Sequence, residues 1–371
     1  MSTPDSIEAP KADTHIIDPH APATFGERVS RILGAVAGDP TARAEIDMAR
    51  VLEELRALGA QPIEDCTPEE ARRQPSPADA VSSLMAKYGI SDPDYDIPTR
   101  DASYESGGEP LGLRIYRPAN GGDPRPIVVY YPGGGWVLSN LDDYDSSARA
   151  IAARTGAVVV AVETRRAPEH KFPAAHDDAI AAYAHVLKNA EAFGGTPDVA
   201  AVVGESAGGN LAINVAIAAR DHDMQPPVHL ALIYPIAGVD TTTPSFRINE
   251  FARPVNKAII EWIFGHALMS PSEKEDPRLD VVGRADLAGL PPTTLLTAEI
   301  DPLRSEGLEL GNRLRAAGVD VNGVDFEGVS HGFFGMGAIV RHARTAQEIV
   351  GRDLAAAFAV DGRGCRVGRA L

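Results

Sequence analysis

The chain has 371 residues, of which 44% are hydrophobic and 23% charged, enough to bury one large core with a smaller accessory layer. With 35 basic and 52 acidic side chains its formal net charge is −17, which repels phosphate backbones and anionic lipid surfaces. Nucleic acid is therefore excluded as an expected partner. A solvated surface is the simpler explanation of the acidity, and we infer no substrate from it.

The cysteines and the N-terminus indicate the compartment. Cys66 and Cys365 are the two cysteines and lie far apart, so neither a disulfide framework nor a thiolate metal site is suggested. Residues Met1 to Pro22 mix charges with prolines and lack the apolar run of a signal peptide or anchor. No segment is apolar for long enough to span a bilayer. We therefore expect a cytoplasmic protein without a membrane span.

The first hundred residues predict a helical layer. Residues 1–24 are polar and proline-rich without periodicity, which predicts a mobile extension. From Phe25 onward, apolar residues recur at the three- and four-residue spacings of amphipathic helices. Thr67 to Glu70 then reads as an N-cap, a first-turn proline and acidic residues that open another helix. We predict an N-terminal helical cap over residues 25–105.

After a turn-rich stretch from Asp101 to Pro110, strands and helices alternate, which is typical of a mostly parallel central sheet flanked by helices. The expected strands are Leu111–Tyr116, Ile127–Tyr131, Ala157–Val162, Ala200–Val203, His229–Tyr234, Thr293–Thr297 and Val319–Phe326. The expected helices are Asp142–Arg154, Ala174–Asn189, Ala207–Arg220, Leu303–Ala317 and Arg341–Phe358. Residues 236–287 interrupt this alternation with prolines around one helix, Asn256–Leu268. The prediction is an α/β domain over 106–235 and 288–371, with an inserted cap segment at 236–287.

Gly204-Glu205-Ser206-Ala207-Gly208 fits the pattern G-x-S-x-G between an apolar run and a helical pattern. A sharp turn from strand to helix needs small residues on both sides of the serine, and it exposes the hydroxyl beside the positive end of the helix. Serines in glycine-rich turns are more often N-caps than nucleophiles. The interpretation of Ser206 as a nucleophile therefore needs the strand, the helix and further partners.

A second element, Tyr131-Pro132-Gly133-Gly134-Gly135-Trp136, follows another apolar run. Glycines at the exit of a strand allow backbone N–H groups to point into a cavity, as stabilising an oxyanion requires. An isolated glycine triplet is more often a flexible turn.

Ser330-His331-Gly332 and Glu299-Ile300-Asp301 each follow an expected strand, so both lie where loops leave the sheet. A hydroxyl needs an imidazole to accept its proton, and the imidazole needs a carboxylate to fix its tautomer. The order Ser, Asp, His along the chain is that of α/β-hydrolases. Taken alone, His331 could be a core histidine, and Asp301 could be the N-cap of the helix that follows it. If none of these residues were catalytic, the serine turn, the glycine loop, His331 and Asp301 would be four independent coincidences.

Several stretches together resemble the hormone-sensitive lipase family of bacterial esterases, and the match runs from about Leu52 to Phe358. The stretches that carry the resemblance are Tyr130–Leu138, Arg166–His170 with Phe172–Ala175, Gly204–Asn210, Leu290–Pro292, Asp301–Gly307 and Ser330–Phe334.

The resemblance implies an α/β-hydrolase fold, a cap built from the N-terminal helices and the inserted segment, and short-to-medium acyl esters as small-molecule substrates. It implies a triad of Ser206, Asp301 and His331 and an oxyanion hole of Gly134, Gly135 and Ala207. Trp136 and Gly133 are the expected substrate contacts. The family often pairs through its last strand and helix, which leaves a homodimer through 319–358 open.

Two positions depart from the family pattern. Pro132 stands where the family usually has histidine, and it donates no hydrogen bond, so the glycine loop must be held differently. Reduced activity or altered specificity stays open. Position 205 is Glu where Asp or Thr is usual, so a longer carboxylate needs a partner that the sequence does not name.

We expect no cofactor and no metal. His170, His176 and His185 lack the spacing of a helical metal site, and neither a G-x-G-x-x-G motif nor a P-loop lysine is present. Two rival functions stay open: an amidase, lactonase or carbamate hydrolase with the same triad, and a ligand-binding pseudo-hydrolase like the plant hormone receptors that resemble this family. Intact triad residues argue against the pseudo-hydrolase, and Pro132 argues weakly for it.

Overall fold

The computed structural model describes residues 18–91, 97–119, 121–138 and 140–367, with side chains up to residue 360. Its helices are α1 (Phe25–Val36), α2 (Ile46–Ala57), α3 (Pro68–Ala71), α4 (Pro77–Tyr88), α5 (Asp145–Thr155), α6 (Ala174–Lys188), α7 (Ala207–Asp221), α8 (Pro244–Ile248), α9 (Lys257–Ala267), α10 (Val281–Arg284), α11 (Arg304–Ala316) and α12 (Arg341–Val367). Its strands are β1 (Thr99–Ser106), β2 (Glu109–Tyr116), β3 (Arg125–Tyr131), β4 (Val158–Val162), β5 (Gly195–Glu205), β6 (Leu230–Ile233), β7 (Thr293–Ile300) and β8 (Val321–Ser330). The structure confirms every strand and helix that we expected in the α/β domain. It also confirms the helix expected in the insertion. The ends of these elements are shifted by up to five residues, and α12 extends beyond Phe358.

The strands form one eight-stranded sheet in the order β1-β2-β4-β3-β5-β6-β7-β8. β2 runs antiparallel to both of its neighbours, and all other neighbouring pairs are parallel. The mostly parallel sheet predicted from the alternation of strands and helices is therefore confirmed. β8 forms one edge of the sheet.

The turn-rich stretch predicted from Asp101 to Pro110 is wrong. These residues form most of β1 and the start of β2, which pair along their whole length around a tight turn at Gly107 and Gly108. Both glycines have positive φ, 59° and 86°, as a two-residue hairpin turn requires. Most of β1 is solvent-exposed and polar, so it lacks the hydrophobic pattern that identifies a strand. The predicted cap region, residues 25–105, thus includes a strand of the sheet.

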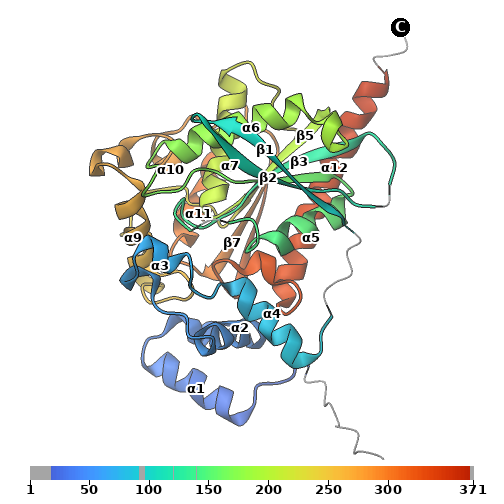
Figure 1. Cartoon of the computed structure of the whole chain (residues 1–371). Coiled ribbons are helices and arrows are strands. Elements are labelled where there is room, and N and C mark those ends of the chain that lie inside the picture. Colours follow the sequence, from blue (N-terminus) through green and yellow to red (C-terminus); the bar gives the residue numbers. More distant parts are fainter. Residues whose placement is uncertain (1–17, 92–96, 120, 139, 368–371) are drawn as a thin grey trace, which may run out of the picture.

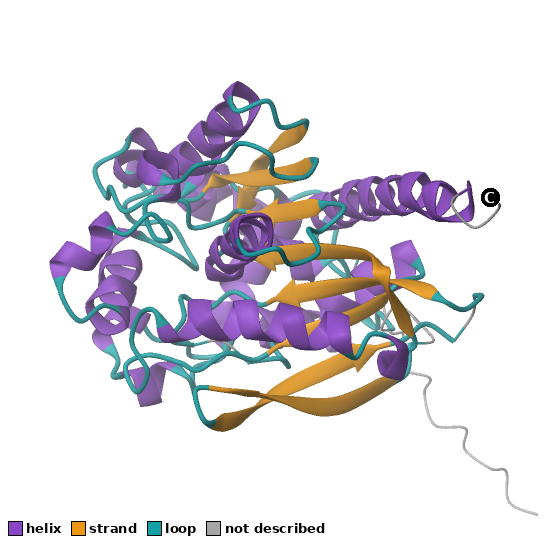
Figure 2. Cartoon of the chain, turned by 90° about the horizontal axis from the view of Figure 1, so that it is seen from above, coloured by secondary structure: helices purple, strands orange, loops and turns teal. Residues whose placement is uncertain are grey.

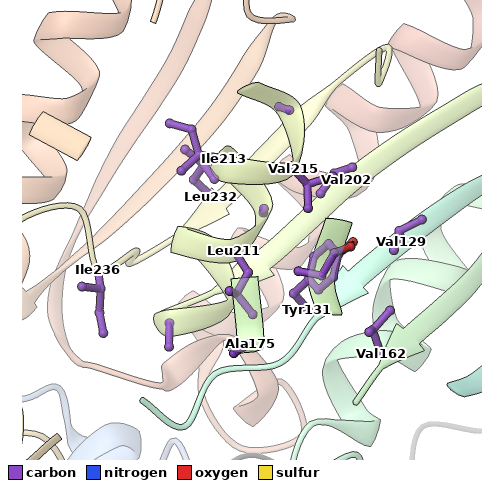
Figure 3. Packing of buried hydrophobic residues seen from close by; sticks show 14 of the residues in the cluster. Val129, Tyr131, Val162, Ala175, Val202, Leu211, Ile213, Val215, Leu232 and Ile236 are labelled. Atoms are coloured by element: carbon purple, nitrogen blue, oxygen red, sulfur yellow. The ribbon is translucent and has the colours of Figure 1, made fainter. Parts of the chain in front are cut away.

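Helices cover both faces of the twisted sheet (Figure 2). Along β3 the side chains alternate, with Val129 and Tyr131 in one buried cluster and Val128 and Tyr130 in the other. The first cluster packs against α6, α7 and α11, and the second packs against α5 and α12. Figure 3 shows the first cluster around α7, the helix that follows Ser206. Because both faces are covered, the central strands read as continuous apolar runs.

The helices α1 to α4 gather at one end of the molecule, and α9 of the inserted segment lies beside α3 (Figure 1). Side-chain hydrogen bonds join the N-terminal part to the insertion, among them one from Arg43 to Asn249 at 2.5 Å. The indole Nε1 of Trp262 donates to the carbonyl of Cys66 at 3.1 Å, and the amide of Asn256 donates to Glu64 at 2.8 Å. These two parts of the chain, far apart in sequence, therefore form one layer.

The predicted mobile extension covers residues 1–24. Its first 17 residues lie outside the part of the chain that the structure describes. Residues 18–24 contact the body of the protein. Pro19 is buried, and its carbonyl accepts a hydrogen bond from Arg50 at 2.6 Å. His20 accepts a hydrogen bond from Arg344 of α12 at 3.0 Å. This short segment is thus anchored to α2 and α12.

Candidate active site

Ser206 lies at a sharp turn between β5 and α7. Its φ of 56° and ψ of −118° place a non-glycine residue in a strained region of backbone space. The turn also needs the two glycines of the motif. A Cβ at Gly204 would lie 2.0 Å from the carbonyl oxygen of Gly208, and a Cβ at Gly208 would lie 2.0 Å from that of Tyr131. The G-x-S-x-G spacing is therefore a steric requirement of this turn.

The structure brings the three predicted triad residues into one row. Nε2 of His331 lies 2.9 Å from Oγ of Ser206, and Nδ1 lies 2.7 Å from Oδ2 of Asp301. Ser206, Asp301 and His331 directly follow the parallel strands β5, β7 and β8. All three residues therefore lie at the carboxyl ends of these strands, on the same side of the sheet. All three side chains are buried, with relative exposures of 7% for Ser206, 6% for His331 and 1% for Asp301.

The carboxylate fixes the tautomer of the imidazole. The other oxygen of Asp301, Oδ1, accepts the backbone N–H of Leu303 at 2.9 Å, which orients the carboxylate. Because a carboxylate oxygen accepts, Nδ1 of His331 carries the proton, and the lone pair of Nε2 faces the Ser206 hydroxyl. This arrangement allows the imidazole to take the hydroxyl proton.

The glycine loop lies beside Ser206. Three consecutive residues have positive φ: Gly134 at 99°, Gly135 at 62° and Trp136 at 59°. At Gly135 a Cβ would also meet Ile263 of α9 at 2.4 Å. The loop folds back on itself, since the carbonyl of Gly134 accepts N–H groups from Val137 and Leu138. Ala207 begins α7, so its N–H is one of the four that a helix leaves without an internal partner.

Pro132 leaves the bracing of this loop to other residues. The hydroxyl of Tyr131 donates to the carbonyl of Ala179 in α6 at 2.8 Å. The carbonyl of Trp136 accepts the N–H of Ala167 at 2.9 Å. From the N-terminal cap, Nε of Arg72 donates to the carbonyl of Val137 at 2.8 Å. Sequence reasoning missed Arg72, since it belongs to no motif and lies far from the loop in sequence.

Glu205 has two tyrosine partners that the sequence did not reveal. The hydroxyls of Tyr130 and Tyr234 donate to its two carboxylate oxygens at 2.6 and 2.5 Å. The side chain is 1% exposed, and burial raises its pKa above the usual value for a glutamate. The ring of Tyr234 lies against the imidazole of His331, with 4.7 Å between ring centroids. Glu205 thus connects the ends of β3 and β6 to the loop that carries His331.

A pocket of about 630 Å³ opens onto Ser206, His331, Gly134 and Gly135. Its volume lies within the range of small-molecule sites. Apolar side chains of the two cap parts line it, among them Leu52 and Leu55 of α2 and Ile259, Ile260 and Ile263 of α9. Polar side chains also reach it, among them Glu64, Arg72, Asp143 and Asn256. The pocket therefore suits a largely apolar ligand placed against the serine.

Trp136 and Gly133, the two expected substrate contacts, do not line this pocket. The Trp136 ring is buried in a separate small cavity beside His176 and Phe172. At Gly133 a Cβ would lie 2.5 Å from the hydroxyl of Tyr144, so this glycine allows Tyr144 to pack closely against the loop. Trp136 has a positive φ, and its side chain lines the small cavity and not the pocket at the serine. The place of Trp136 directly after the glycines does not reveal this direction.

In the part of the chain that the structure describes, no group of three or more His, Cys, Asp or Glu side chains is arranged to hold a metal ion. Within the same residues, no helix is both long enough and apolar enough to cross a bilayer. His176 donates from Nε2 to Asn210 at 2.8 Å, and burial lowers its pKa to about 4. It is therefore a neutral core histidine at neutral pH.

Comparison with known proteins places the chain in a family. A family model described as "alpha/beta hydrolase fold" matches residues 128–335. The carboxylesterase NlhH of Mycobacterium tuberculosis is 40% identical over 274 residues, covering 71% of this chain and 82% of that protein. The ethyl acetate hydrolase of Pseudomonas putida is 32% identical over 299 residues, covering 79% and 92%.

Among solved structures, the ester hydrolase EH1AB1 from the metagenome of Lake Arreo aligns with a TM-score of 0.76 and 30% identity, covering 85% of this chain and 99% of its own. The family match spans the nucleophile turn, the glycine loop and the His331 loop. The chain therefore belongs to the α/β-hydrolase family and, within it, to the hormone-sensitive lipase family of bacterial esterases that its motifs predicted.

Proposed function

We propose that this protein is a serine carboxylesterase that hydrolyses small, largely apolar esters through an acyl-enzyme intermediate. The observation that carries the proposal is the row Asp301–His331–Ser206, with distances of 2.7 and 2.9 Å, at the floor of a 630 Å³ pocket. The names of its relatives, a carboxylesterase and an ethyl acetate hydrolase, support ester substrates.

In the proposed mechanism, His331 takes the proton of Ser206 as its oxygen attacks the ester carbonyl. The N–H groups of Gly134, Gly135 and Ala207 stabilise the resulting oxyanion. Protonated His331 then gives its proton to the leaving alcohol. Water enters, His331 activates it, and the acid is released. Asp301 holds the imidazole in the required tautomer and stabilises its cationic form.

The test uses Ser206→Ala with p-nitrophenyl acetate, butyrate and octanoate. We expect the variant to lose turnover on all three esters while it unfolds at the same urea concentration as the wild type, because only the hydroxyl is removed. If Ser206→Ala hydrolysed these esters at the wild-type rate, the assignment of the nucleophile would be wrong.

Two further measurements separate the rival functions. Covalent labelling by a fluorophosphonate is expected for the wild type and not for Ser206→Ala, and a pseudo-hydrolase would leave both unlabelled. A comparison of p-nitrophenyl butyrate with the matched anilide separates esterase from amidase, since an amide leaving group needs fuller protonation. The cytoplasmic location and a homodimer through residues 319–358, which include the edge strand β8, stay predictions.

A further inference from the structure

Arg72 links the N-terminal cap to the glycine loop. It is the residue at the C-terminal end of α3, and its side chain is 18% exposed. Nε donates to the carbonyl of Val137 at 2.8 Å, and Nη2 donates to the carbonyl of Ala167 at 2.7 Å. Both acceptors are backbone groups on segments that border the glycine loop. One guanidinium therefore holds two strand-exit loops together from outside the α/β domain.

The same guanidinium is itself held in place. Nη1 and Nη2 donate to the two carboxylate oxygens of Glu169 at 2.7 and 2.8 Å, the bidentate geometry that suits arginine. This interaction lowers the pKa of Glu169 to about 2. Glu169 follows Ala167 by two residues, and the N–H of Ala167 donates to the carbonyl of Trp136 at 2.9 Å. Arg72, Glu169 and Ala167 thus form a closed network around the end of the glycine loop.

The loop needs such a brace. Gly134, Gly135 and Trp136 all have positive φ, and a tryptophan in that region is strained by about 1 to 2 kcal/mol. Pro132 precedes them and has no N–H to donate. The N–H groups of Gly134 and Gly135 stabilise an oxyanion only if the loop keeps its direction, since donors that are about 1 Å out of place lose much of their effect.

We propose that Arg72 is a positioning residue for the oxyanion hole, so that the cap helps to complete the catalytic site in addition to covering it. This inference rests on the proposed esterase function. It predicts that removing the guanidinium lowers the rate of the chemical step more than it weakens substrate binding.

The experiment compares Arg72→Ala and Arg72→Lys with Arg73→Ala in the full-length protein. Arg73 is the next residue and is 65% exposed, where it pairs with Glu69, so its removal controls for the loss of one cap cation. We expect kcat of Arg72→Ala to fall about 10- to 100-fold while KM changes less than about 3-fold. The kcat of Arg72→Lys should lie between those of the wild type and Arg72→Ala, because an ammonium group cannot reach all the acceptors in this geometry. Arg73→Ala should keep both constants.

Two readouts separate positioning of the loop from simple anchoring of the cap. A trifluoromethyl ketone forms a hemiketal oxyanion with Ser206, so its inhibition constant should rise by about the same factor as kcat/KM falls. Added guanidinium ion, below the concentration that unfolds the protein, should restore part of the kcat of Arg72→Ala and none of Arg73→Ala. Should Arg72→Ala fail to fold, Arg72→Lys carries the same test.

A higher KM with unchanged kcat and unchanged affinity for the ketone would overturn the inference and leave Arg72 as a cap anchor. An inactive wild type would instead contradict the proposed function itself, so the two failures are distinguishable.

Discussion

Glu306 is a buried carboxyl group in the first turn of α11, and the stability of the protein should depend on its protonation. Burial raises its pKa from 4.5 to about 8, and its Oε1 accepts the N–H of Ala237 at 2.8 Å. Between these two pKa values the folded protein keeps a proton that the unfolded chain releases. Folding is therefore progressively disfavoured as the pH rises from about 4.5 to 8. At about 1.4 kcal/mol per pH unit, the accumulated loss is about 5 kcal/mol.

The perturbation is Glu306→Gln, which cannot ionise and keeps an oxygen for the N–H of Ala237. Urea unfolding followed by tryptophan fluorescence at half-unit steps from pH 5 to pH 9 would give the free energy of unfolding of both proteins. We expect the free energy of unfolding of the variant to increase relative to that of the wild type as the pH rises. The difference should change by a few kcal/mol, and by at most about 5 kcal/mol, up to pH 9. Glu309→Gln, exposed on the same helix, is the matched control and should follow the wild type. A difference between Glu306→Gln and the wild type that stays constant with pH would refute the reasoning.

Three further predictions concern charged groups. Glu205→Gln replaces one carboxylate oxygen by an amide nitrogen, which cannot accept the hydrogen bond that Tyr130 or Tyr234 donates, so kcat should fall about 10-fold as the support of the His331 loop weakens, and an unchanged kcat would contradict this. Asp301→Asn should lower kcat by roughly 10³- to 10⁴-fold in steady-state assays without loss of folding, since the amide favours the wrong tautomer. Arg165→Met leaves the fully buried Asp178 without its cation at 2.8 Å, so urea unfolding should show a loss of about 3 kcal/mol, and a loss below about 1 kcal/mol would count against the pair.

The sequence by itself determined the features that depend on neighbouring residues. Gly204 must be glycine because a Cβ there would strike the backbone of Gly208, four residues later. A Cβ at Gly208 would strike the backbone of Tyr131 at the start of the glycine loop. The turn around Ser206 could therefore be recognised from five letters. The continuous apolar runs predicted the central strands, because both faces of the sheet are covered. The order of Ser206, Asp301 and His331 followed from the order of the strands that precede them.

Only the tertiary structure decided which distant side chains meet. Arg72 reaches Val137 across 65 positions of sequence, and Glu205 meets Tyr234 across 29. Such contacts leave no local pattern, because a salt bridge or a buried hydrogen bond depends on the packing of whole elements and not on residue spacing. The same reason explains two features that the sequence did not reveal. β1 is an exposed edge strand without apolar alternation. The Trp136 ring lines the small cavity beside His176, on a backbone with positive φ. Local chemistry therefore identified the reacting groups, and long-range packing determined how they are braced.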